Sequence, residues 1–174
     1  MADESRRSFL KRGLLGSALL VSAGALGGLG LSLWPTLSIT PQRPLVILNA
    51  TELSIVAALA ETITPGTDPI AVAHRVDSFI SSLEAPDQRD VQRLLHLVES
   101  ALFGLVLDGR ARPFSRATIA QRTAALGRMR DSRVTLRRGG YQVLRRLIGA
   151  ARWTDEAAWP TLGYVGPPQL VIPT

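Results

Sequence analysis

Two histidines each precede an acidic residue by three positions, a spacing that could serve metal chemistry. His74 pairs in this way with Asp77, and His96 pairs with Glu99. Residues three apart share one face of a helix, so each pair could offer two ligands to a metal ion. Di-iron helix bundles use the reverse order, Glu-x-x-His, with all ligands directed into the core. The four residues form one candidate constellation, that of a stand-alone metal protein or enzyme.

Helical geometry argues against this candidate. His74 lies about 180° around the helical wheel from the apolar side of its segment, and His96 lies about 130° from the centre of its own apolar stripe. We therefore expect both histidines to face solvent in exposed pairs. The chain has no cysteine, which excludes thiol, haem-attachment and cysteine-metal chemistry, and it has no nucleophile or phosphate-loop motif. The sequence predicts no catalytic, cofactor-binding or metal-binding residue in this chain.

Arginine is concentrated in the second half of the chain. Residues 49–108 carry nine acidic side chains and three arginines, a net charge of −6, whereas residues 110–152 carry twelve arginines and one aspartate, a net charge of +11. The basic half could pair with the acidic half of the same molecule, bind an acidic protein surface, or bind anionic lipid head groups. Nucleic acid would suit such a cluster, but we do not expect it because the chain begins with an export signal. The arginines concerned are Arg128, Arg130, Arg133, Arg137, Arg138, Arg145, Arg146 and Arg152.

Aromatic residues gather near the C-terminus among glycines and prolines. Three of the five Trp and Tyr residues of the chain fall within twelve positions there. This segment could strap across the helices and bury its rings, or it could form a rigid interface hot spot. The candidate partner interface consists of Trp153, Trp159, Pro160, Leu162, Gly163, Tyr164, Gly166 and Pro167.

The elements that must position these residues are helices. Apolar residues recur at helical spacing in 51–63, in 70–83, in a segment that starts at Pro86 and runs to 106, after Ser115, and in 134–153. We expect Thr51 and Ser115 to cap the first and fourth helices, and the fifth to be weakened or bent at Gly139-Gly140. No segment alternates with period two. The prediction is an all-α bundle of about five helices with an irregular tail rich in Pro, Gly and aromatic residues.

The first 34 residues have a different composition. The stretch "SRRSFLKR" carries four cations and is followed by 22 residues without a charge, the order of an export signal. The pattern S-R-R-x-F-L-K resembles the twin-arginine motif, which is read by the machinery that exports folded proteins. The signal residues are Arg6, Arg7, Phe9, Leu10 and Lys11.

The fate of the apolar run 13–34 is open. As a helix it would be about 33 Å long, enough to cross a hydrocarbon core of roughly 30 Å. Ala23-Gly24-Ala25 offers a cleavage site, whereas Trp34 at the far end favours an uncleaved anchor. The sequence therefore divides into a signal or membrane anchor (1–34), a proline-rich linker (35–48) and a helical domain (49–174) that lies outside the inner membrane.

Three segments that follow the signal resemble the gluconate 2-dehydrogenase subunit 3 family, the small or gamma subunits of membrane-associated FAD-dependent dehydrogenases. They are "LNATELSIVAALAETITPGTDP", "AVAHRVDSFI" and "WPTLGYVGPP". The resemblance implies a noncatalytic subunit that holds no cofactor of its own, because the large subunit holds FAD and oxidises a sugar or alcohol. It also implies that the small subunit carries the export signal for both and brings the pair to the twin-arginine translocase.

We therefore expect this chain on the periplasmic side of the inner membrane, assisting the maturation and export of a flavoprotein. Whether a cytochrome subunit completes the complex stays open. An alternative from another class is a membrane-anchored periplasmic scaffold for an unrelated partner.

Overall fold

The part of the chain that the structure describes is helical throughout. The computed structural model describes residues 38–100, 112–156, 159–160 and 163–166. It contains five α-helices, short 3-10 segments and no strand within these ranges, which confirms the predicted all-α class. The elements are α3 (Ala50–Ile63), α4 (Pro69–Ser81), α5 (Ala85–Glu99), η2 (Phe114–Arg116), α7 (Ile119–Arg130) and α8 (Thr135–Trp153).

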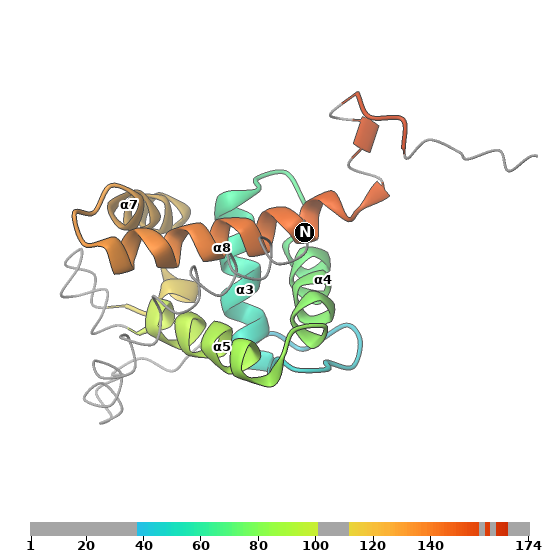
Figure 1. Ribbon diagram of the computed structural model, residues 1–174, viewed down its shortest axis with the longest axis horizontal. Helices are drawn as coiled ribbons and strands as arrows, with labels where there is room; N and C mark the ends of the chain where they lie inside the picture. Colours follow the sequence, from blue (N-terminus) through green and yellow to red (C-terminus); the bar gives the residue numbers. More distant parts are fainter. Residues whose placement is uncertain (1–37, 101–111, 157–158, 161–162, 167–174) are drawn as a thin grey trace, which may run out of the picture.

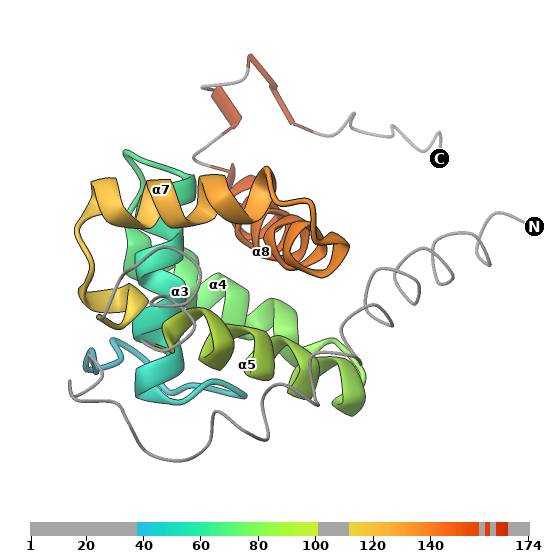
Figure 2. The ribbon, with the colours of Figure 1, turned by 90° about the vertical axis from the view of Figure 1, so that its left-hand side faces the viewer.

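Helix α3 is the centre of the bundle. Nine consecutive residues, 52–60, are buried, and α3 contacts α4, α5, η2, α7 and α8. A helix that is covered on all sides cannot keep a polar stripe, so residues 52–60 are apolar or small except for Glu52. Figure 1 shows α8 crossing α3, and Figure 2 shows α7 and α5 toward opposite ends of α3.

Two predicted helix caps are wrong. The first helix is capped by Asn49 rather than Thr51: the Asn49 side chain accepts the Glu52 N–H at 3.0 Å, and the Glu52 carboxylate accepts the Asn49 N–H at 2.9 Å. Thr118 and Gln121 make the same reciprocal arrangement at the start of α7. Such a capping box satisfies two orphan N–H groups, and loss of the cap costs about 1 kcal/mol. Ser115, the predicted cap of this helix, lies in η2 instead.

Helix α8 runs without interruption through Gly139 and Gly140. A Cβ atom on Gly140 would lie 3.3 Å from Leu94 Cδ1 and 3.5 Å from Met129 Cε, whereas one on Gly139 would meet nothing within 4 Å. Gly140 therefore lets α8 approach α5 and α7 closely, and this packing explains the glycine better than the predicted bend.

The segment before α3 packs against the helices. Leu48 is buried, and Ile39, Leu45 and Ile47 contact the core. The Ile39 N–H also donates to Ser54 Oγ at 2.8 Å. Residues 38–48, the described part of the predicted linker, therefore pack against the helical domain.

Candidate functional site

Asp77 holds the segment before α3 against α4. Its carboxylate is buried and accepts three successive backbone N–H groups, those of Val46 at 2.8 Å, Ile47 at 3.0 Å and Leu48 at 2.8 Å. Successive N–H groups around a carboxylate satisfy its charge without a cation. The prediction that Asp77 belongs to an exposed pair is wrong, and the residue serves as a structural clasp.

His74 lies on the same helix and is buried without a hydrogen-bond partner. Its exposed fraction is 3%, and neither Nδ1 nor Nε2 has a partner. Burial, followed by the positive charge of Arg43, lowers the pKa of His74, while Asp77 and Asp68 act in the opposite direction. The prediction that His74 faces solvent is wrong. His74 lies one helical turn before Asp77, and the apolar pattern of the helix did not reveal that this face is buried.

A second polar cluster joins α3 to α5. Glu52 is buried, and its Oε1 lies 3.0 Å from Nε2 of His96, whose side chain is 57% exposed. Glu52 Oε2 accepts the Gln92 side-chain amide at 3.3 Å as well as the N–H of its capping partner. His96 does reach solvent, as predicted, but its partner is Glu52 of another helix.

Glu99 is buried at the end of α5 and binds η2. It accepts the Ser115 N–H at 2.8 Å and the Ser115 hydroxyl at 2.6 Å. Like Asp77, Glu99 was expected to be exposed and is instead a carboxylate that anchors backbone. The part of α5 predicted to continue to 106 lies outside the described residues.

The four residues of the metal hypothesis are thus engaged separately. Asp77 binds backbone, His96 binds Glu52, Glu99 binds Ser115, and His74 has no polar partner. Within the described ranges, no group of three or more His, Cys, Asp or Glu side chains could hold a metal ion. The geometry does not bring the four residues of the candidate constellation together.

The C-terminal residues form a structured turn that begins at the last residue of α8, which we call the aromatic turn (Trp153, Trp159, Pro160, Gly163, Tyr164 and Gly166). The Trp159 indole N–H donates to the Trp153 carbonyl at 3.0 Å. The Trp159 and Tyr164 rings meet edge to face with centroids 5.3 Å apart. Backbone bonds join Gly163 to Pro160 and Tyr164 to Trp159, so the side chains and the backbone fix one another.

Two glycines of the aromatic turn are required by its geometry. Gly163 and Gly166 have φ of 69° and 109°, conformations that other residues adopt only with strain. A Cβ on Gly166 would also lie 3.4 Å from Trp159 Cζ3. These constraints give a physical reason for the spacing of the predicted interface residues.

The aromatic turn is displayed rather than buried. Trp153 is 43% exposed, Tyr164 47%, and the neighbouring Val165 is fully exposed. Figures 1 and 2 show the described tail projecting from the end of α8 away from the bundle. The described rings therefore do not strap across the core, which was one of the two alternatives. Leu162 and Pro167, also predicted for this interface, lie outside the described residues.

The end of α8 is fastened to α4 beside this turn. Arg75 Nη2 of α4 lies 2.6 Å from Asp155 Oδ2, with both side chains partly buried. The Arg152 guanidinium stacks 5.1 Å from the centroid of the Trp153 ring. A cation over an indole face is attractive, so the turn starts from a fixed helix end.

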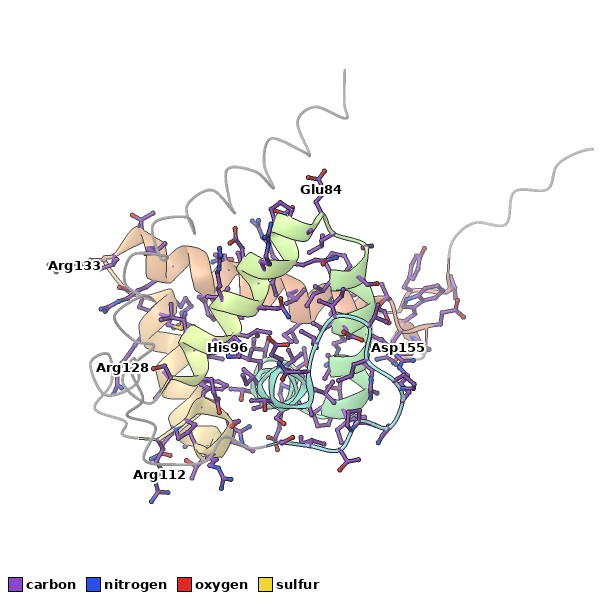
Figure 3. All side chains as sticks on the ribbon, turned by 90° about the horizontal axis from the view of Figure 1, so that it is seen from below. Glu84, His96, Arg112, Arg128, Arg133 and Asp155 are labelled. Carbon is purple, nitrogen blue, oxygen red and sulfur yellow. The ribbon has the colours of Figure 1, made fainter. Side chains whose placement is uncertain are left out.

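The arginines of the second half differ in their partners. Arg122 reaches the acidic half, with Nη1 2.6 Å from Glu61 Oε2, and Arg130 pairs with its neighbour Asp131. Arg138 and Arg145 are exposed and take part in no ion pair between described residues. Figure 3 shows Arg112, Arg128 and Arg133 at the periphery, on the side away from Asp155. Pairing with the acidic half therefore accounts for Arg122 and not for Arg130, Arg138 or Arg145.

The predicted signal and anchor lie outside the described residues, and so do Arg6, Arg7, Phe9, Leu10 and Lys11. No helix of the described ranges is long and apolar enough to span a bilayer.

Comparison with protein-family models, with curated proteins and with solved structures finds no match to this chain. The resemblance to the dehydrogenase small-subunit family stays a prediction from the sequence.

Proposed function

We propose that this chain is the noncatalytic small subunit of a periplasmic FAD-dependent dehydrogenase complex. It carries the twin-arginine signal, assists the maturation and export of the flavoprotein, and positions that subunit at the outer face of the inner membrane. The substrate, a sugar or an alcohol, and FAD belong to the large subunit.

The observation that carries this proposal is the exposed, preorganised aromatic turn. Trp, Tyr and Arg are the residues most enriched at interface hot spots, and here they are held by hydrogen bonds, ring contacts and two glycines before any partner arrives. Preorganisation reduces the entropy lost on binding. The buried carboxylates of Glu52, Asp77 and Glu99 support a noncatalytic role, since each accepts hydrogen bonds that hold the fold together.

The proposal is tested by purifying the tagged full-length chain from its native host and recording the absorption spectrum of what accompanies it. A flavoprotein partner would add flavin bands at about 370 and 450 nm. Because removing a hot-spot residue costs 2 kcal/mol or more, we expect a chain with both Trp159→Ala and Tyr164→Ala to retain at least about tenfold less flavin.

The matched control is Phe79→Ala, which removes another exposed aromatic side chain, 41% exposed on α4. This variant should retain the flavin of the unmodified chain. A purified chain that brings no flavin with it, or equal losses in the two variants, would contradict the proposal.

A further inference from the structure

The segment before α3 is attached to α4 next to a buried histidine. Asp77 of α4 accepts the backbone N–H groups of residues 46–48, and Figure 3 shows the segment as a loop beside α4. His74 precedes Asp77 by three positions, so the two side chains share one face of the helix. The carboxylate that holds the segment is therefore a near neighbour of the imidazole.

His74 is poorly placed to carry a charge in the folded domain. It is 3% exposed, and neither ring nitrogen has a hydrogen-bond partner. A buried charge is costly unless it is paired and hydrogen-bonded. A proton on His74 therefore favours any opening of the structure that lets water reach the ring.

Charged groups of the segment and of α4 act on this imidazole. Burial lowers its pKa most, and the positive charge of Arg43 lowers it further, whereas Asp77 and Asp68, the N-cap of α4, act in the opposite direction. The next cation of α4, Arg75, is paired with Asp155, which follows α8. A cation that opposes protonation is therefore carried by the segment itself.

A proton on His74 weakens the attachment of the segment in two ways. The imidazolium attracts the carboxylate of Asp77, which must then be shared between a cation and three backbone N–H groups. The imidazolium also repels Arg43. Both effects favour a state in which the segment has moved away from α4.

The segment is also the neighbour of α4 that separates most easily. Residues 43–48 form no helix or strand, and Arg43, Pro44 and Val46 are exposed. Helices α3 and α8, by contrast, pack against α4 and contribute many of the buried apolar side chains of the core. Local opening takes place where few apolar contacts hold the backbone, so we expect the segment to open before the helices do.

We infer that His74 and Asp77 form an acid-sensitive release for residues 43–48, in which a proton on His74 frees the segment from α4 while the helices stay folded. The inference goes beyond the proposed function and does not depend on it. If residues 13–34 stay in the membrane as an anchor, the release adds up to about 20 Å of extended chain between the anchor and the domain.

The test is amide hydrogen exchange of the full-length chain in detergent micelles, with each rate divided by the intrinsic rate at the same pH. In the released state His74 should regain its ordinary pKa of 6.5. Because the released state then binds more protons, acid favours it, and between about pH 7.5 and about pH 5.0 the opening can increase by at most about 30-fold. We expect the protection of residues 46–48 to fall by about tenfold over this range.

Urea separates release of the segment from unfolding of the domain. Local opening exposes little surface, so exchange of residues 46–48 at about pH 5.0 should not change in about 1 M urea, whereas exchange of residues 53–60 in α3 should become faster. Equal acceleration of both groups by urea would overturn the inference. This comparison uses the unmodified chain and needs no variant to fold.

The two histidines of the chain supply the variant and its matched control. His74→Leu should abolish the loss of protection at residues 46–48 on acidification, because it keeps Asp77 and removes the group that takes up the proton. His96→Gln removes the other histidine, which is bonded to Glu52, and should keep the full loss. An acid-induced loss that persists in His74→Leu, or that disappears in His96→Gln, would assign the release to another group.

Discussion

A single imidazole illustrates how burial changes the role of a side chain. His74 is buried one helical turn before Asp77, and it has no hydrogen bond to compensate a charge. Its pKa is lowered by burial and by Arg43, so the folded protein holds it neutral at pH values where the unfolded chain already binds a proton. The unfolded state then binds more protons, and stability must fall as pH falls below the ordinary value of 6.5.

We predict that His74→Leu flattens this pH dependence. Between about pH 7.5 and about pH 5.5, the free energy of unfolding of the unmodified protein should drop by about 1 kcal/mol more than that of the variant. Urea unfolding at the two pH values measures the difference. Both proteins keep His96 and every carboxylate, so identical losses would show that His74 does not titrate on unfolding.

For single side chains, the sequence indicates hydrogen-bond partners that lie a few positions away and does not indicate partners that are distant along the chain. Asn49 and Glu52 have the spacing of a capping box, which is visible in the sequence. The prediction of Thr51 as the N-cap did not use it. The partners of Asp77 lie 29 to 31 positions away and are backbone groups, so no residue type marks them. The helical wheel led us to expect Asp77 and Glu99 at the surface because it considers only where the apolar residues of the same helix lie.

The helices themselves were largely predictable, because apolar periodicity is a local property. Helices α3 and α4 begin within one residue of the predicted starts at 51 and 70. Periodicity did not reveal that α3 is buried on all sides, since that depends on what packs around it. Nor did it distinguish a glycine that bends a helix from one that admits a neighbour, as Gly140 does.

The two adjacent glycines of α8 give a direct test of this packing. We predict that Gly140→Val lowers the free energy of unfolding by about 1–3 kcal/mol, because its methyl groups would overpack Leu94 and Met129. Gly139→Val is the matched control and should stay within about 0.5 kcal/mol, since no atom lies within 4 Å of its Cβ position. Chemical denaturation of the three proteins measures both values, and equal effects would contradict the close approach of the helices.

The molecule as a whole combines a predicted export segment with a helical domain. The buried carboxylates of this domain bind groups of the domain itself. The sequence predicts candidate interface residues in the tail, which stay a prediction, and the structure shows how the described ones are arranged and exposed. The sequence could not choose between buried and displayed rings, because the same aromatic and glycine content suits both.

Export of the complex is predicted to depend on the arginine pair. Exchanging Arg6 and Arg7 for Lys should leave the flavoprotein's dehydrogenase activity in the cytoplasmic fraction, because lysine lacks the planar guanidinium that the motif presents. Activity in periplasmic and cytoplasmic fractions measures the outcome. Arg12→Lys, a conservative exchange outside the pair, should export normally, and normal export of the double variant would refute the assignment of the signal.

The three hydrogen bonds from residues 46–48 to Asp77 also determine how the domain bears mechanical load. A pull applied to the chain ahead of residue 39 first meets the single bond from the Ile39 N–H to Ser54 Oγ of α3. Once that bond is broken, the pull reaches α4 through the three bonds to Asp77 before it reaches the first turn of α3. Because the three bonds are adjacent and share one carboxylate, they must stretch together. The N-terminal end of the central helix is thereby shielded from tension by the bonds to Asp77.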